Sequence, residues 1–274
     1  MDAIMKGQQI DLVTRQSIAK EILRFTARVL DALSIPFYLI GGSALGAVRH
    51  GDIIPRDDDI DIGVPREGYR RLIESFPADG RYALLHPSIT RGYYSPMVKI
   101  VDRRTLLEES MCHAFEGMGV FIDVFPLDFA ASQSCAVRRG LFMKRLYNYS
   151  YVLDWSRDET RRLGVAKFCF SVFARLATVG RTAPEFLGMV EASLDEERDE
   201  ADSIFNLWGA WQERELVPAE WFGEGALMGF GGETYPVPEK WDLYLTRIYG
   251  DYMKPPESVP HTHGGAWFRR GAVL

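Results

Sequence analysis

The chain has 274 residues, of which 47% are hydrophobic and 26% charged, the composition of a folded, soluble protein. Its formal net charge of −6 argues against a general nucleic-acid-binding protein. No apolar run is long enough to span a bilayer, and Met1–Ile10 lacks the apolar core of a signal peptide, so we expect a cytoplasmic protein. The widely spaced cysteines indicate reduced thiols, not a disulfide framework or a zinc site: Cys112, Cys135 and Cys169.

The first half of the chain predicts a mixture of strands and helices. A helical pattern runs from Thr14, its expected cap, to about Leu33, and a short buried strand follows at 37–40. Apolar side chains alternate with acids at 59–64, which is typical of a half-buried strand. The other elements expected here are helices at 43–49 and 67–76 and strands at 82–85, 97–101, 105–109 and 120–125.

The second half differs in character. From about 134 to 200 the pattern is helical with few turn signals, and a strand at 226–230 and a helix at 238–249 follow. We therefore predict an α+β fold. Its expected parts are a mixed-sheet core at 1–131, a mainly helical lobe at 132–216 and a C-terminal segment at 217–274 that packs back on the core and completes the active site.

A dense group of acids accompanies the strand expected at 59–64. In an extended segment Asp57, Asp59 and Asp61 share one face, with neighbours on that face about 7 Å apart. Two unit charges 4 Å apart repel by about 4 kcal/mol at an effective dielectric of 20, and a divalent cation turns this repulsion into attraction. Because Ile60 and Ile62 require burial of the opposite face, we predict a rigid Mg²⁺ or Mn²⁺ site and not a solvated acidic loop.

The same acids match the first ligands of a calcium-binding EF-hand, whose loop begins D-x-D-x-D. The match ends at the next positions, because Ile62 stands where that loop requires glycine and Gly68 where it requires glutamate. An EF-hand is therefore excluded.

A small tripeptide, Gly41-Gly42-Ser43, lies between the strand at 37–40 and the next helix. Glycines let backbone N–H groups approach a phosphate, and a helix N-terminus adds partial positive charge. Taken alone, the tripeptide is more typical of a plain turn. The order strand, Gly-Gly-Ser, helix, Asp-x-Asp strand resembles the nucleotidyltransferase fold, in which the loop binds the phosphates of a nucleotide and the acids hold metal ions. Arg49 and His50 lie between the two motifs.

A single carboxylate, Asp123, interrupts the apolar strand at 120–125. Burying it without a partner would cost several kcal/mol, so it needs either a metal ion or a basic side chain such as arginine. We favour the metal site, because such sites need an acid on a neighbouring strand. Asp128, nearer a turn, is interpreted as structural, and Lys99 either contacts phosphate or is a snorkelling strand lysine.

Three blocks of the sequence together resemble the LicD family. The first is G-G-S-A-L-G-A-V-R-H-G at 41–51 with I-P-R-D-D-D-I-D at 54–61, the second is F-I-D-V-F-P-L-D at 121–128, and the third is Y-G-D-Y-M at 249–253 with Pro255, Pro256 and a later histidine. The family includes bacterial phosphocholine transferases of teichoic acid and lipopolysaccharide and the catalytic domains of fukutin and fukutin-related protein. Arg56 stands where the family usually has tryptophan, so it either alters donor recognition or contacts phosphate.

The resemblance implies a nucleotidyltransferase-like core and a metal-dependent phosphotransferase. Such an enzyme moves a phospho-alcohol from a CDP-activated donor, such as CDP-choline, to a sugar hydroxyl of a cell-surface glycan in lipopolysaccharide, teichoic acid or capsule, and releases CMP. Choline, ribitol, glycerol and ethanolamine are all compatible with the sequence. The implied catalytic and metal-binding acids are Asp57, Asp59, Asp61 and Asp123, with Asp123 or Asp57 as general base. The residues expected to hold the donor are Gly41, Gly42, Ser43, Arg49, His50 and Lys99.

Two other functions use the same motifs. A true nucleotidyltransferase would activate a sugar or alcohol phosphate with an NTP and release pyrophosphate. A binding module for nucleotides or glycans would not need the complete set of acids, which argues against it.

The pair His261 and His263 is interpreted as an acceptor or phosphate contact, or as part of a disordered tail.

The helical stretch is strongly basic. Residues 132–183 contain ten Lys or Arg and three acids, a net +7 that leaves −13 for the rest of the chain. Large apolar side chains are interleaved with these cations: Phe142, Phe168, Phe170, Phe173 and Leu176. One interpretation is peripheral attachment to an anionic membrane at the inner face of the plasma membrane, where the family's acceptors are often lipid-linked. The other is an ordinary helical lobe with its aromatic stripe in the core.

Overall fold

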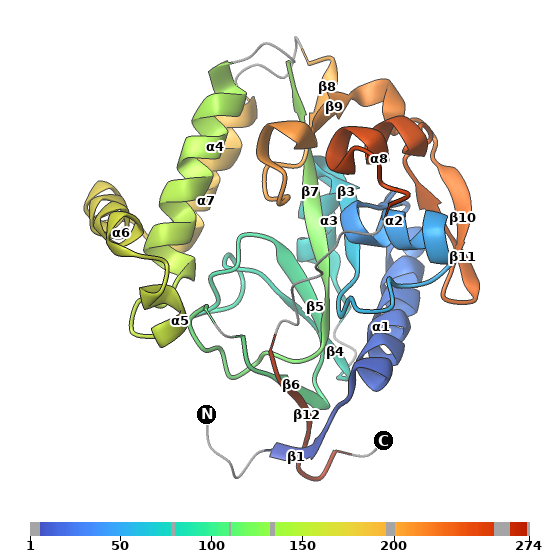
Figure 1. Cartoon of the computed structure of the whole chain (residues 1–274), viewed down its shortest axis with the longest axis horizontal. Coiled ribbons are helices and arrows are strands. Elements are labelled where there is room, and N and C mark those ends of the chain that lie inside the picture. The colour runs from blue at the N-terminus through green and yellow to red at the C-terminus, as the bar shows by residue number, and fades with distance from the viewer. Residues whose placement is uncertain are drawn as a thin grey trace.

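The computed structural model describes residues 6–77, 80–109, 111–131, 135–195, 201–254 and 264–272 (Figure 1). Its core is a mixed β-sheet with the order β2-β3-β7-β5-β4. The central strand β7 (Phe121–Ala130) lies parallel to β3 (Asp61–Pro65) and antiparallel to β5 (Val98–Asp102). β2 (Tyr38–Leu39) flanks β3, and β4 (Tyr82–Leu85) flanks β5. The predicted α+β class is confirmed.

The sheet extends beyond the strands expected from the sequence. The last three residues of β7 pair with β8 (Ser203–Phe205), which in turn pairs with β9 (Leu216–Pro218). A second sheet joins β1 (Lys6–Gln9), β12 (Ala266–Arg269) and β6 (Thr105–Leu107). None of β1, β8, β9 and β12 was predicted, because each is only three or four residues long and β1, β8 and β12 pair with distant parts of the chain.

Helices α1 (Leu12–Ala32), α3 (Arg66–Ser75) and α7 (Ala183–Asp195) pack on the sheet, each against the central strand β7. The cap of α1 is Asp11, whose carboxylate accepts the N–H of Thr14 at 2.8 Å. The prediction of Thr14 as the cap was therefore wrong by three residues, because an aspartate satisfies the first free N–H groups at least as well as a threonine.

Helix α2 (Gly41–His50) packs against β3 on one side and against C-terminal elements on the other. Those elements are α8 (Trp241–Tyr249) and β10 (Ala226–Phe230), which forms a hairpin with β11 (Glu233–Val237). Segments about 200 residues apart in sequence thus meet at the start of α2, where the Tyr244 hydroxyl accepts the N–H of Gly41 at 3.0 Å.

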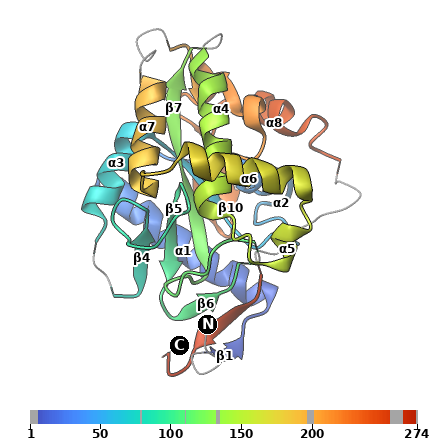
Figure 2. The same cartoon turned by 90° about the vertical axis from the view of Figure 1, so that its left-hand side faces the viewer.

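The basic stretch forms a helical layer beside the sheet (Figure 1). Helix α4 (Cys135–Tyr147) packs on α7 and continues into the π-helical turn η1 (Asn148–Val152). Helix α6 (Val165–Ala177) lies outside them, against α4 and η1, and crosses the outer surface of α4 in Figure 2. The short helices are α5 (Asp158–Arg161), η3 (Gln212–Glu215) and η4 (Ala219–Trp221). None of the described helices is long and apolar enough to cross a membrane.

The large apolar side chains of α6 do not enter the core. Phe168 and Phe173 are each 51% exposed and Leu176 is 69% exposed, whereas the small residues Ser171 and Ala174 are buried. The expectation that this aromatic stripe packs in the core was therefore wrong, although Phe170 is partly buried against it.

Candidate active site

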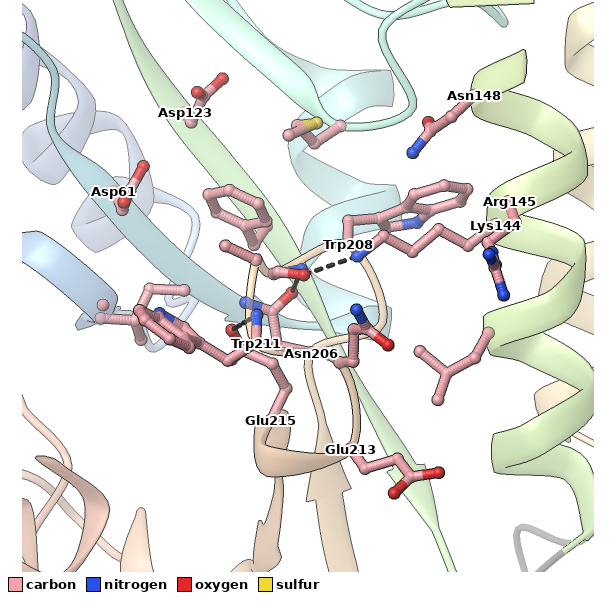
Figure 3. A pocket seen from close by; sticks show the side chains of 18 of the residues that line it. Asp61, Asp123, Lys144, Arg145, Asn148, Asn206, Trp208, Trp211, Glu213 and Glu215 are labelled. Carbon is pink, nitrogen blue, oxygen red and sulfur yellow. Dashed lines mark hydrogen bonds between the residues drawn. The ribbon is translucent and has the colours of Figure 1, made fainter. Parts of the chain in front are cut away.

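Strand register brings three charged side chains together at the centre of the sheet. Asp61 of β3 lies beside Asp123 of β7, and Lys99 of β5 lies on the other side of Asp123. The Lys99 ammonium contacts both carboxylate oxygens of Asp123, at 2.9 and 3.1 Å. Carboxylate oxygens of Asp59, Asp61 and Asp123 all lie within 4.8 Å of one another. Asp61 and Asp123 project from neighbouring strands into one cavity (Figure 3).

The other acids lie in the loop before β3, not in the strand as the alternating pattern suggested. Helix α1 holds this loop in place. Arg15 forms a fully buried ion pair with Asp58 at 2.7 Å, and the Gln16 amide donates to the carbonyl of Asp57 at 2.7 Å. Asp57, Asp58 and Asp59 form a second acidic group within 4.8 Å. The rigidity of the acidic run therefore comes from a long-range contact with α1.

Crowding and burial disfavour the ionised form of two of these acids, Asp61 and Asp57. Burial, and then the charges of Asp59, Asp123 and Asp57, raise the pKa of Asp61 well above its ordinary value. Burial and the neighbouring Asp59 raise the pKa of Asp57 to about 7. The nearby cations do not offset this accumulation of negative charge. A cluster of partly buried hard oxygen donors with excess negative charge is suited to a divalent cation, so the residues fit the expected metal.

The Gly-Gly-Ser turn packs directly against the acids. Gly41 has a φ of +52°, and a Cβ at Gly42 would lie 3.1 Å from a carboxylate oxygen of Asp57. The Ser43 hydroxyl is buried and accepts the N–H of Asp61 at 2.8 Å, so it fixes the start of β3. The turn and the acids therefore form one continuous site at the N-terminus of α2.

A cavity of about 820 Å³ opens over these groups and has a second wall opposite the sheet. In Figure 3 the side chains of Lys144, Arg145 and Asn148 project from the helical layer on the side opposite Asp61 and Asp123. The segment 206–215 lies between the two walls and contributes Trp208 and Trp211, among other lining residues. We refer to the wall formed by Asp59, Asp61, Asp123 and the Gly41-Gly42 turn as the acidic wall. The basic wall is formed by Arg138, Lys144, Arg145, Asn148 and Tyr149.

Buried polar groups hold the segment 206–215 in place. The Lys144 ammonium donates to the carbonyl of Gly209, and the Glu215 carboxylate accepts the N–H of Trp211 at 3.2 Å. Burial lowers the pKa of Lys144 to about 8 and raises the pKa of Glu215 to about 7. The sequence analysis missed both the basic wall and the segment 206–215. The basic residues of α4 were noticed only as part of a charge total, and no local motif marks Glu215 or Trp211.

The remaining predicted residues are placed as follows. Lys99 is buried beneath the acids, paired with Asp123, and does not snorkel to solvent. Arg49 and His50 lie in the last turn of α2, and neither belongs to the described residues that line the cavity. Asp128 lies within β7, not near a turn, and forms a buried two-pronged ion pair with Arg66. His261 and His263 lie outside the described residues.

Comparison with known proteins shows what this chain resembles. Residues 34–145 match the family described as LicD/FKTN/FKRP, nucleotidyltransferase domain. The chain is 25% identical over 266 residues to the lipopolysaccharide cholinephosphotransferase LicD of Haemophilus influenzae, which covers 93% of this chain and 97% of that protein. Human ribitol 5-phosphate transferase FKRP is 51% identical over 45 residues, 16% of this chain and 9% of that protein. Human ribitol-5-phosphate transferase FKTN is 36% identical over 61 residues, 22% of this chain and 13% of that protein.

Proposed function

We propose that the chain is a LicD-type, metal-dependent phosphotransferase. In this proposal it moves a phospho-alcohol from a CDP-activated donor to a sugar hydroxyl of a cell-surface glycan. The match along nearly the whole of a bacterial cholinephosphotransferase supports transfer of a phospho-alcohol to a glycan. The single observation that carries the mechanism is the convergence of Asp59, Asp61 and Asp123 beside the Gly41-Gly42 turn.

In the proposed reaction the sugar hydroxyl attacks the β-phosphorus of the CDP-alcohol. A new bond forms between the sugar oxygen and phosphorus, the bond from that phosphorus to the bridging oxygen breaks, and CMP leaves with the bridging oxygen. The hydroxyl proton passes to a carboxylate. We assign this role to Asp57, because Lys99 occupies both oxygens of the other candidate, Asp123.

The two walls divide the work of binding. Asp59, Asp61 and Asp123 would hold Mg²⁺ or Mn²⁺, which would supply charge neutralisation at the diphosphate. The Gly41-Gly42 turn offers a helix N-terminus to phosphate. Arg138 and Arg145 of the basic wall supply positive charge for the leaving nucleotide or the acceptor. Such preorganised charges account for most of the catalysis that phosphoryl transfer requires.

The test is a panel of CDP-alcohols, each offered with a glycan acceptor and Mg²⁺, with CMP release as the measured quantity. Asp59→Ala and Asp61→Ala should each lower turnover by about a thousandfold or more. Each substitution removes a ligand of the metal ion whose positive charge would stabilise the transition state. The matched control is Asp158→Ala, an exposed carboxylate on α5 that should leave turnover unchanged. Full activity in either variant, with native circular dichroism, would remove the metal assignment. Release of pyrophosphate from an NTP in place of CMP would identify a nucleotidyltransferase.

A further inference from the structure

We propose that the outward face of α6 lies on the surface of an anionic lipid bilayer. The polarity of this helix is opposite to that of an ordinary surface helix, because Ser171 and Ala174 face the protein while most of its large apolar side chains face solvent. Within α6, Val165, Phe168, Val172 and Leu176 recur every three or four residues and so form one stripe, and Val179 follows in the turn after the helix. These five side chains are between 46% and 78% exposed. A continuous exposed apolar stripe marks a surface that is covered in use.

Charge identifies what covers it. The segment 160–181 contains five cations, Arg161, Arg162, Lys167, Arg175 and Arg181, and no acid. The side chains of Lys167 and Arg175 on α6 itself are exposed. Apolar side chains flanked by cations match an anionic bilayer, which accepts the apolar face between its headgroups and attracts the cations. A second copy of the chain is a poorer partner, because a symmetric contact through this face would bring the same cations together.

The stripe lies one helix away from the active-site cavity. The Ser171 hydroxyl donates to the carbonyl of Tyr149 at 3.1 Å, and the Arg145 guanidinium lies over the ring of Phe170 at 5.6 Å. Tyr149 and Arg145 both line the cavity. A bilayer against α6 would therefore lie close to the basic wall. Resting on the proposed function, this arrangement implies an acceptor whose sugar hydroxyl is attached to a membrane lipid.

The exposed thiol of Cys169 provides a probe on α6 itself. In a Cys135→Ser variant, an environment-sensitive fluorophore attached to Cys169 reports transfer into lipid. The third thiol competes weakly, because burial raises the pKa of Cys112 to about 12 and thiolates are the reactive form. Vesicles of phosphatidylcholine containing phosphatidylglycerol should shift the emission to the blue at low salt, and pure phosphatidylcholine vesicles should not.

Sedimentation with the same vesicles measures affinity in unlabelled variants. Lys167→Gln with Arg175→Gln should weaken binding by about 30-fold, since each cation near an anionic surface contributes about a fivefold factor. Phe168→Ser with Leu176→Ser should also weaken it, whereas the matched control Leu227→Ser, a 73% exposed apolar residue on β10, should not. No blue shift and no sedimentation, or formation of a dimer that covers Cys169, would overturn the proposal.

Turnover separates this inference from the proposed function. The α6 variants should release CMP normally when the acceptor is a soluble sugar and should lose activity only on a lipid-linked acceptor in vesicles. Loss of activity on the soluble acceptor would make α6 part of the catalytic site and contradict a docking role. Vesicle binding without CMP release from any CDP-alcohol would overturn the proposed function and leave the docking surface intact.

Discussion

The two walls of the cavity carry opposite charges, and burial acts against both. On the acidic wall, burial and crowding raise the pKa of Asp61, which favours its neutral form. On the basic wall, burial lowers the pKa of Lys144 to about 8, which also favours the neutral form. A ligand of the opposite charge would stabilise the ionised side chains of each wall: a cation on the acidic side and a phosphate on the basic side. The cavity as a whole is therefore suited to a ligand that carries both, such as a metal-bound diphosphate.

The walls also differ in how the chain builds them. The acidic wall comes from two adjacent strands, the loop before β3 and the Gly41-Gly42 turn, and strand register alone brings Asp61 beside Asp123. The basic wall comes from α4 and the η1 turn that continues it, and this helical unit lies opposite the sheet only through tertiary packing. Substitutions in the acidic wall should therefore affect the stability of the central sheet, and substitutions in the basic wall should have more local effects.

The largest expected effect on stability is in the acidic wall. Lys99→Met removes the ammonium group that pairs with the buried Asp123 carboxylate and should lower the free energy of unfolding by about 3–5 kcal/mol. Urea denaturation measures this change. The control is Lys240→Met, which breaks an exposed pair with Glu220 and should cost about 1 kcal/mol or less. Equal effects in the two variants would mean that the acidic wall is no more tightly coupled to the core than the surface is.

A smaller effect, dependent on pH, is expected beside the basic wall. Burial raises the pKa of Glu215 from its ordinary 4.5 to about 7. Between these two pH values the folded chain keeps a proton on Glu215 that the unfolded chain releases. Stability contributed by this proton is present below pH 4.5 and is lost as the pH rises toward 7. Glu215→Gln removes this loss. The free energy of unfolding of the variant should therefore increase relative to that of the wild-type chain by roughly 2 kcal/mol between pH 5 and pH 8.

Thermal unfolding of both proteins across this pH range tests the prediction. The matched control is Glu213→Gln, an exposed carboxylate in the same short helix, whose stability difference from the wild-type chain should stay flat. A flat difference for Glu215→Gln as well would show that the folded chain binds no extra proton at this position.

The smallest effect concerns binding of the donor. Arg145→Ala removes one exposed cation of the basic wall and should raise KM for the proposed CDP-alcohol donor by about tenfold, with a smaller change in kcat. Steady-state CMP release measures both constants. Arg139→Ala on the same helix is the control, because Arg139 is not among the described residues that line the cavity. A change confined to kcat would place Arg145 at the reacting phosphorus and not at the bound nucleotide.

The sequence predicts the acidic wall better than the basic one for a physical reason. Alternation at Ile60, Ile62 and Val64 predicted a strand with one buried face, and all three side chains are fully buried. A lone acid in an apolar strand indicated that Asp123 has a charged partner, and it pairs with Lys99. Both signals are local, because a strand's periodicity and composition record its burial.

Long-range partners left no such signal. Nothing near Arg15 or Asp58 in the sequence indicates that they pair across 43 positions, and the same holds for Arg66 and Asp128. The segment 206–215 has no recognisable motif, yet it contributes Trp208, Trp211 and Glu215 to the cavity. These contacts depend on how helices and strands dock, and that information is distributed over the whole core.

The contacts between α1 and the acidic loop affect how the protein folds. The hydrogen bond from Gln16 to Asp57 joins residues 41 positions apart, so the loop reaches its final geometry only after a long segment has closed. That closure also forces the carboxylates together, which opposes docking in the absence of a counter-ion. A divalent ion captured by the finished cluster would stabilise the native state by mass action. Maturation of the enzyme would then be coupled to the divalent ions available in its surroundings.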